Sequence, residues 1–256
     1  SVILIGISMY VQLHLEETPA FKELEAIKLR KQAEGSVKAV SEVVDPSEVN
    51  LDRSPVLEAL RIYPGRIALA AGAFISIKVT FYILIAFVVA YGTNESGLGL
   101  PRSTMLSAVL IASVVQLAVQ FQAASYSDRH GRRGVYLAGA ALLGIWAFAL
   151  FPLIDTGNFF LIVIAISGGL SFMAMQYGPQ AAFYTELFST QVRYSGASLG
   201  YQIGAILGGA FAPTIAVLLW KEFGIVYVSV YIAIAALVTI GSVYMLTETS
   251  GKDIHA

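Results

Sequence analysis

Residues 67–92 read IALAAGAFISIKVTFYILIAFVVAYG, and these 26 residues include one charged side chain, Lys78. A helix of about 20 apolar residues crosses a bilayer core about 30 Å thick, so this stretch is long enough to span a membrane. Five further stretches are as apolar, each at least 21 residues long, and carry no charge: 103–125, 134–154, 159–185, 195–219 and 224–246. The sequence therefore predicts an all-α integral membrane protein with a bundle of six transmembrane helices.

The composition excludes a soluble fold and several kinds of site. Of the 256 residues, 57% are hydrophobic and 13% are charged, whereas a soluble domain carries about 25% charged residues. The chain has no cysteine, which excludes disulfides, thiolate metal sites and cysteine nucleophiles. The three histidines lie apart and outside the six stretches (His14, His130 and His255), so we expect no metal site and no cofactor. A net charge of −1 argues against a nucleic acid partner.

Polar residues divide the chain into four parts. We expect 1–14 to be the end of a truncated transmembrane helix, because this apolar run is too short to span a bilayer and lacks the basic start of a signal peptide. Residues 15–66 hold 10 acidic and 8 basic side chains and are expected to form a central loop between two membrane bundles. Residues 67–246 form the six-helix bundle, and 247–256 form a polar tail.

The central loop is expected to carry two short helices and to lie in the cytoplasm. Thr18 and Ser54 are N-cap residues followed by proline, a combination that starts a helix, so helices are expected over about 19–33 and 55–62. Thirteen Lys and Arg residues lie in this loop, the tail and the two connections on the same side, against two in the alternate connections. The positive-inside rule therefore places the loop and the C-terminus in the cytoplasm.

Glycine and proline spacing predicts how the spans pack. In the fifth stretch a glycine recurs every four residues, which puts four of them on one helix face where another backbone can approach closely: Gly196, Gly200, Gly204 and Gly208. Such a face serves packing and also permits sliding, and both uses stay open. Pro179 and Pro213 lie within spans, where proline kinks a helix. Interrupted helices often border ligand sites in membrane proteins.

A charged hexad lies between the second and third stretches: Asp128-Arg129-His130-Gly131-Arg132-Arg133. An acid at a helix end, a glycine turn and several arginines can form a latch of ion pairs between neighbouring helix ends, where the low dielectric strengthens them. The alternative is that the basic residues only follow the positive-inside rule. The ordered spacing of acid, glycine and arginine favours the latch.

This hexad resembles the D-R-x-G-R-R core of the loop signature of the major facilitator superfamily, in the copy between its eighth and ninth helices. The chain has Ala124 where the family usually has a glycine four residues before the acid. Two further motifs agree in order and spacing. Glu17-Thr18-Pro19 resembles the motif after helix six, and Glu186-Leu187-Phe188 with Arg193 and Gly196 resembles the E-x-F…R-x-x-G pattern between helices ten and eleven.

The end of the chain resembles one branch of that superfamily. Glu248-Thr249-Ser250-Gly251-Lys252 is similar to the P-E-T-K-G ending of the sugar-porter-like branch, with Thr247 in place of the proline and Ser250 in place of the lysine. The run from Tyr184 to Ser198 resembles the metabolite:proton symporter group, which includes carriers of shikimate, 2-oxoglutarate, citrate and proline or betaine.

The resemblance implies the C-terminal half of a twelve-helix fold, whose partner is a missing N-terminal six-helix half. It also implies secondary active transport of a small polar metabolite, such as an organic acid, across the cytoplasmic membrane by alternating access with proton symport. A facilitator and a drug exporter of the same superfamily are rival functions. An intramembrane enzyme would need buried paired acids or a serine with a histidine, which the six stretches lack, and nothing in the sequence favours a receptor.

Lys78 is the first candidate for substrate binding. It lies about a dozen residues into the first stretch, near mid-membrane depth, where a charge is costly unless it is paired or hydrated. We expect it to face the transport cavity and to attract a carboxylate substrate. The alternatives are an acidic partner in the missing half and a side chain that extends toward the membrane surface.

Uncharged polar side chains of the spans form a second set of candidates, because they can hydrogen-bond a small metabolite: Thr80, Tyr82, Gln116, Gln120, Gln176, Tyr177, Gln180 and Tyr184. The four glutamines form two pairs, each four residues apart and therefore on one helix face. A glutamine in hydrocarbon needs a partner. The pairs are therefore expected to point inward, toward substrate, water or another helix.

A charged cluster is expected to control opening at the cytoplasmic face: Asp128, Arg129, Gly131, Arg132, Arg133, Glu186 and Arg193. Ion pairs that form in one conformation alone would shift the conformational equilibrium. Proton coupling has no evident residue, since no Asp, Glu or His lies deep in the six stretches. The coupling group is Glu186 or a residue of the missing half, or coupling is absent.

Overall fold

The structure is a computed structural model that describes residues 60–188 and 193–246, apart from the side chains of Thr185 and Arg193. The chain divides into two compact units, 1–52 and 53–256, and all described residues belong to the second. The expected truncated helix, most of the central loop and the tail lie outside the described residues. Of the short helix expected over 55–62, residues 60–62 are described, and they are helical.

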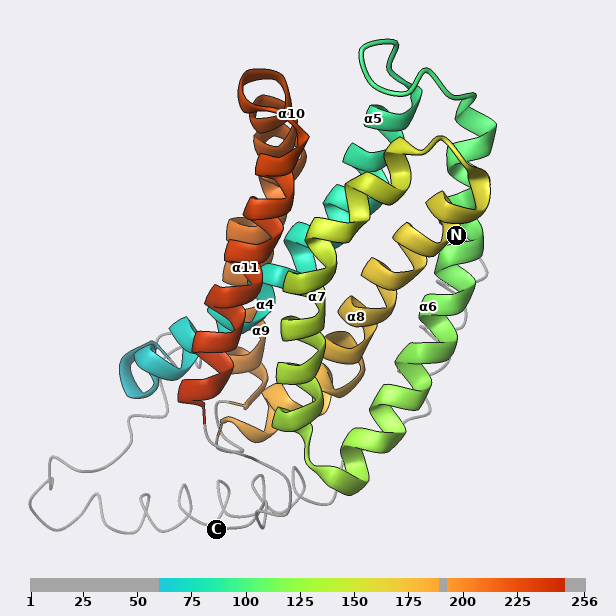
Figure 1. Ribbon diagram of the computed structural model, residues 1–256. Coiled ribbons are helices and arrows are strands. Elements are labelled where there is room, and N and C mark those ends of the chain that lie inside the picture. Colours follow the sequence, from blue (N-terminus) through green and yellow to red (C-terminus); the bar gives the residue numbers. More distant parts are fainter. Residues whose placement is uncertain (1–59, 189–192, 247–256) are drawn as a thin grey trace, which may run out of the picture. The chain divides into compact units, whose positions relative to one another are not determined.

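Six helical spans are present in the described residues, and they confirm the fold class predicted from the sequence (Figure 1). The first span consists of α4 (Pro64–Tyr82), a π-helical turn η1 (Ile83–Phe87) and α5 (Val88–Thr93). The next three are α6 (Arg102–His130), α7 (Arg132–Asp155) and α8 (Phe159–Glu186). The fifth consists of α9 (Arg193–Ala205), a π-helical turn η2 (Ile206–Ala210) and α10 (Ala212–Phe223), and the sixth is α11 (Ile225–Met245). No strand occurs in the described ranges.

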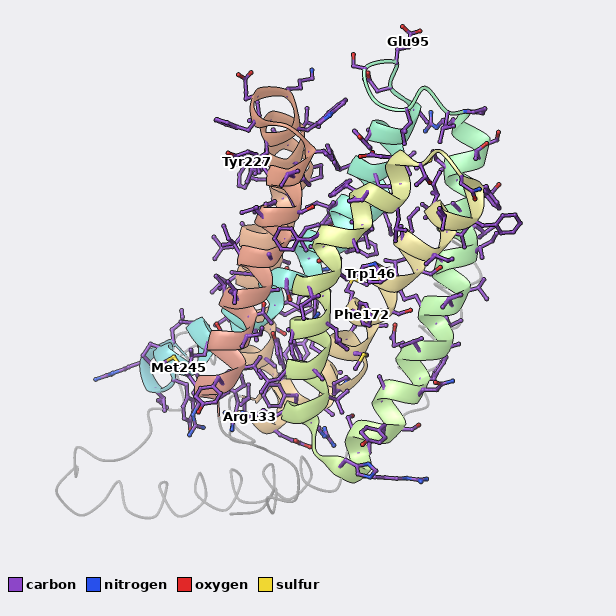
Figure 2. The ribbon with its side chains drawn as sticks, in the orientation of Figure 1. Glu95, Arg133, Trp146, Phe172, Tyr227 and Met245 are labelled. Atoms are coloured by element: carbon purple, nitrogen blue, oxygen red, sulfur yellow. The ribbon has the colours of Figure 1, made fainter. Side chains whose placement is uncertain are left out.

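Successive spans run in opposite directions, so their connections gather at two ends of the bundle (Figure 1). We call the end with the α6–α7 connection the basic end and the other the opposite end. Figure 2 shows Arg133 and Met245 at the basic end and Glu95 at the opposite end. Each span therefore starts at one end of the bundle and finishes at the other.

A single residue, Gly131, joins α6 to α7. Its φ of 97° lies in a region that residues with a Cβ rarely adopt, and its N–H donates to the carbonyl oxygen of Ser127 at 3.0 Å. Because the chain reverses in one residue, Asp128 and Arg132 are helical. The charged hexad is thus two helix ends joined by a glycine rather than an extended loop.

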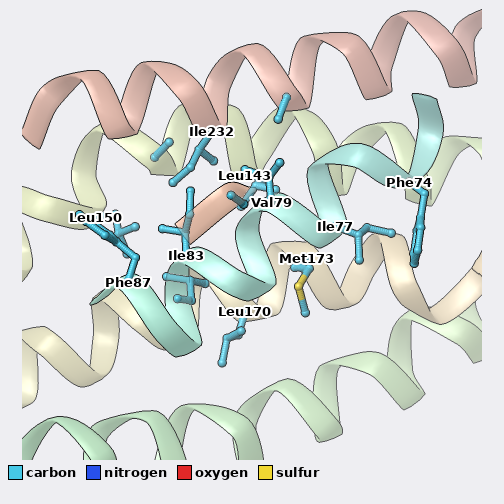
Figure 3. Packing of buried hydrophobic residues seen from close by; sticks show 14 of the residues in the cluster. Phe74, Ile77, Val79, Ile83, Phe87, Leu143, Leu150, Leu170, Met173 and Ile232 are labelled. Atoms are coloured by element: carbon cyan, nitrogen blue, oxygen red, sulfur yellow. The ribbon is translucent and has the colours of Figure 1, made fainter. Parts of the chain in front are cut away.

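The first span forms the centre of the bundle. α4 packs against α8, α9 and α11, and 56% of the most apolar part of the span is buried, compared with 17% for α6. Figure 3 shows residues of α4 among those of α7, α8 and α11: Phe74, Ile77, Val79, Leu143, Met173 and Ile232. In lipid, close side-chain packing rather than exclusion of water holds such helices together.

The repeated glycines bring α9 close to α4. A Cβ at Gly200, Gly204 or Gly208 would lie 2.6 to 2.8 Å from an atom of α4. Gly196 instead meets the ring of Phe188, at 2.5 Å from such a Cβ. These distances are shorter than side-chain carbons tolerate, so the three glycines allow backbone contact between the two helices.

The first and the fifth span depart from regular α-helix, since each contains a π-helical turn, η1 or η2. Pro213 lies in the first turn of α10, just after η2, whereas Pro179 lies inside α8. In α4 the hydroxyl of Thr239, from α11, accepts from the N–H of Ser76 at 3.1 Å and donates to the carbonyl of Gly72 at 3.0 Å. Those two backbone groups are hydrogen-bond partners in a regular helix. Thr239 therefore ties α11 into the backbone of α4.

Candidate functional site

Lys78 lies at the middle of the first span and on its least buried side. It is about 21 Å from the Pro64 end at a rise of 1.5 Å per residue. Ile75, Lys78 and Tyr82 are all incompletely buried, and their spacing puts them on one stripe of a helix that is otherwise mostly buried. Lys78 therefore lies on a partly exposed stripe of α4 that borders α9 and η2.

An aromatic pair holds the ammonium group of Lys78. Its Nζ donates to the hydroxyl of Tyr201 at 3.3 Å and lies 5.0 and 5.1 Å from the ring centroids of Phe74 and Tyr201. The two rings are 4.3 Å apart at 35°. Cations are attracted to aromatic rings within about 6 Å. Among the described residues, no acidic side chain forms an ion pair with Lys78.

Sequence reasoning missed both aromatic residues. Tyr201 directly follows Gly200, and Gly200 belongs to the face that contacts α4. A large side chain beside that face must lie at its edge and reach a residue of the neighbouring helix. The glycine spacing thus carried a signal for Tyr201, whereas nothing in the sequence distinguished Phe74 from other aromatic residues.

The buried polar candidates mostly bond to other helices. The Ser76 hydroxyl donates to Oε1 of Gln176 at 2.6 Å, and the Tyr184 hydroxyl donates to the carbonyl of Ala70 at 2.6 Å. Both bonds join α8 to α4. Thr80 and Gln180 are also buried, and Thr80 Oγ1 and Gln180 Nε2 have no hydrogen-bond partner among the described residues.

The other polar candidates lie nearer the surface of the bundle. Gln116 and Gln120 are half-buried on α6, near Gly178 of α8, where an added Cβ would lie 2.9 Å from the carbonyl of Gln120. Tyr82 and Tyr177 are exposed, at 39% and 38%. These two tyrosines therefore lie on the outside of the described helices, while Gln120 borders a helix contact.

At the basic end, an ion pair joins the start of α7 to the end of α8. Nη1 of Arg132 lies 2.8 Å from Oε1 of Glu186, and the two side chains are 17% and 21% exposed. Arg132 also lies 3.5 Å from Asp128, whose side chain is 63% exposed. The Glu186 contact is thus shorter and better shielded from solvent.

The remaining arginines of the hexad lie elsewhere. Arg133 donates to the carbonyl of Tyr244 and lies 5.1 Å from its ring, which connects α7 to α11. Arg129 is exposed on α6, beside a surface hollow of about 430 Å³ that Phe121 and Tyr126 also line. The side chain of Arg193 lies outside the described residues. The structure therefore brings three of the expected gating residues together, namely Asp128, Arg132 and Glu186.

Three further contacts that link spans were not expected from the sequence. At the basic end, Arg66 donates to the carbonyl of Leu187 at 2.9 Å. At the opposite end, the hydroxyl of Tyr91 donates to Asp155 at 2.6 Å, and the Tyr91 ring packs edge-on against Trp220 at 5.1 Å. α5, α7 and α10 are therefore joined at that end.

Comparisons with known proteins point to one family. The model of the Major Facilitator Superfamily matches residues 20–254. The inner membrane metabolite transport protein YhjE of Escherichia coli (strain K12) is 31% identical over 260 residues, which cover 99% of this chain and 54% of that protein. The shikimate transporter of the same strain is 35% identical over 173 residues, 67% of this chain and 39% of that protein.

A further relative carries a different substrate in its name. The proline/betaine transporter of Escherichia coli (strain K12) is 24% identical over 253 residues, which cover 97% of this chain and 47% of that protein. The chain spans about half the length of the curated relatives it matches along most of its own length.

Proposed function

The chain belongs to the major facilitator superfamily, a family of transporters rather than enzymes, and on this premise we propose that it forms half of a secondary transporter for a small organic acid. The observation that carries the proposal is Lys78, a partly buried cation at mid-span with no acidic partner among the described residues. A charge at that depth is costly, which supports a functional role for it, and an anion would stabilise it further. A carboxylate supplies one, and shikimate is such an acid.

The exposed tyrosines extend this site. Tyr82 lies one helical turn beyond Lys78 on the partly exposed stripe of α4, and Tyr177 is exposed on α8. The Tyr82 hydroxyl can bond a polar group of a metabolite whose carboxylate is bound by Lys78, and Tyr177 is a further candidate on a different helix. Gln176 and Tyr184, which bond α4, instead fix the position of α8 relative to Lys78.

The ion pair between Arg132 and Glu186 serves as a gate in this proposal. It is short and largely shielded, so breaking it costs more than breaking an exposed surface pair. If it forms in one of the two alternating conformations, it biases the equilibrium between them. Glu186 is also the acid available here for proton symport.

The basic end faces the cytoplasm of a cytoplasmic membrane in this proposal, since the excess of Lys and Arg lies on that side. These 256 residues contain no cysteine, so a cysteine introduced here is the single thiol of this part once any cysteines elsewhere in the full-length transporter are replaced. In intact cells an impermeant maleimide should label Ser96→Cys at the opposite end and should label His130→Cys only after permeabilisation. The reverse pattern would show the inverted orientation.

Uptake tests the proposed function. The transporter that contains this chain, at its full natural length, is expressed in cells and supplied with labelled shikimate, 2-oxoglutarate, citrate or proline. An acid should accumulate, and an uncoupler should abolish the accumulation; uptake that ignores the uncoupler would indicate a facilitator. Lys78→Ala should raise the KM for the acid about 10-fold to 100-fold, while Lys78→Arg should keep most of the affinity. Absence of acid uptake, or an unchanged KM in Lys78→Ala, refutes the proposal.

A further inference from the structure

We propose that the aromatic pair Phe74–Tyr201 selects the charge class of the substrate. The pair holds the ammonium of Lys78 where a cationic ligand would otherwise bind, so the site takes a carboxylate without a cationic group and rejects a quaternary ammonium zwitterion. This inference rests on the proposed function and adds a specificity that the proposed function leaves open.

The first step is that the pair is a binding surface for a cation. Two rings from different helices lie 4.3 Å apart, and aromatic faces attract ammonium groups, including quaternary ones. Here the protein supplies the cation, because Nζ of Lys78 lies within 5.1 Å of both ring centroids. The surface of the two rings is therefore already occupied by the ammonium group of Lys78.

The second step is that Lys78 is held in place along its length. A Cβ at Gly208 or Gly209 of η2 would lie 3.2 or 3.6 Å from the Cβ of Lys78, so the start of the side chain packs against η2. At the other end, the Tyr201 hydroxyl accepts from Nζ. Displacing the ammonium would break both the hydrogen bond and the ring contacts.

The third step is electrostatic. Two cations a few ångströms apart repel strongly where water and salt are scarce, and no acidic side chain among the described residues offsets the charge of Lys78. A zwitterion would bring its own cation next to Lys78. An acid without a cationic group brings only its carboxylate to the site, and the carboxylate is attracted to the ammonium of Lys78.

A matched pair of ligands isolates the cation. Trimethylglycine and 3,3-dimethylbutanoate have nearly the same shape and the same carboxylate, but the first has a quaternary nitrogen where the second has a carbon. Binding of both is measured by calorimetry with the purified full-length transporter. The wild type should bind 3,3-dimethylbutanoate at least about 10-fold more tightly than trimethylglycine.

Two substitutions of Lys78 separate loss of charge from gain of space. Lys78→Ala removes the cation and uncovers the ring pair, so the preference should reverse in favour of trimethylglycine. Lys78→Met removes the charge but keeps a long side chain over the rings, so both ligands should bind weakly without a reversal. Lys78→Ala should also take up labelled trimethylglycine, and the wild type and Lys78→Met should take up less of it.

The inference is overturned if the wild type binds both ligands equally, if Lys78→Ala keeps the wild-type preference, or if Lys78→Met reverses the preference as Lys78→Ala does. The wild-type measurement decides by itself if Lys78→Ala does not fold. A wild type that takes up no organic acid refutes the proposed function separately, because ligand binding to the purified protein does not depend on uptake.

Discussion

Gly204→Ala tests whether backbone contact between α9 and α4 holds the proposed substrate site together. The added Cβ would lie 2.6 Å from the carbonyl oxygen of Ala71 and 2.8 Å from the Cβ of Phe74, whereas ordinary contact begins at 3.4 Å. The helices must therefore separate by roughly 0.6 to 0.8 Å. Because Phe74 stacks on Tyr201, the shift also moves one ring of the pair that holds Lys78.

The expected change in the free energy of unfolding of Gly204→Ala follows from two opposing effects. Overpacking of this kind costs about 1–3 kcal/mol, while alanine in place of glycine within a helix gains about 0.5–1 kcal/mol. Gly241→Ala is the matched control, because it also lies within a helix and no atom lies within 4 Å of its added Cβ. The control should gain stability, and Gly204→Ala should be less stable than the control by about 1–3 kcal/mol.

Thermal unfolding in detergent, followed by tryptophan fluorescence, compares the two variants. Gly204→Ala should unfold at a lower temperature than the wild type and should bind 3,3-dimethylbutanoate less tightly, and Gly241→Ala should do neither. If Gly204→Ala unfolds at the same temperature as Gly241→Ala or above it, α9 and α4 do not depend on backbone contact, and the account of the glycine face is wrong.

Glu186→Gln should lower the maximal rate of transport with little change in KM, because it weakens the shielded contact with Arg132; Asp128→Asn, on a 63% exposed side chain, should change the initial rate little. Gly131→Ala should lower the stability of the protein by about 1–2 kcal/mol, since a φ of 97° strains a residue with a Cβ, and thermal unfolding measures the loss. Thr239→Val should cost about 0.6–2 kcal/mol in the same assay, because the buried hydroxyl that bridges two backbone groups of α4 is removed.

The six spans could be predicted because charge is nearly absent from them and concentrated between them, a pattern that requires no knowledge of contacts. Lys78 stood out for the same reason. Its partners could not be identified, since the pairing of Lys78 with Tyr201 depends on which faces of two helices meet, and these residues are 123 positions apart in the chain.

The charged hexad shows a second limit of prediction from the sequence. Its composition indicates ion pairs, but Arg132 and Arg133 are adjacent and therefore point in different directions from α7, one to Glu186 and the other to Tyr244. Similarly, the expectation that Gln176 points inward does not reveal that Ser76 is its partner. Composition predicts that a polar group needs a partner, and packing determines which partner it has.

The one-residue connection at Gly131 means that a small change of backbone angle there would change the direction of α6 relative to α7. α6 has 29 residues and is therefore about 43 Å long at 1.5 Å per residue. A rotation of about 5° at Gly131 would move the far end of α6 by about 4 Å over that length. Since Arg132 pairs with Glu186 at the end of α8, this ion pair fixes the position of the connection about which any such rotation would occur.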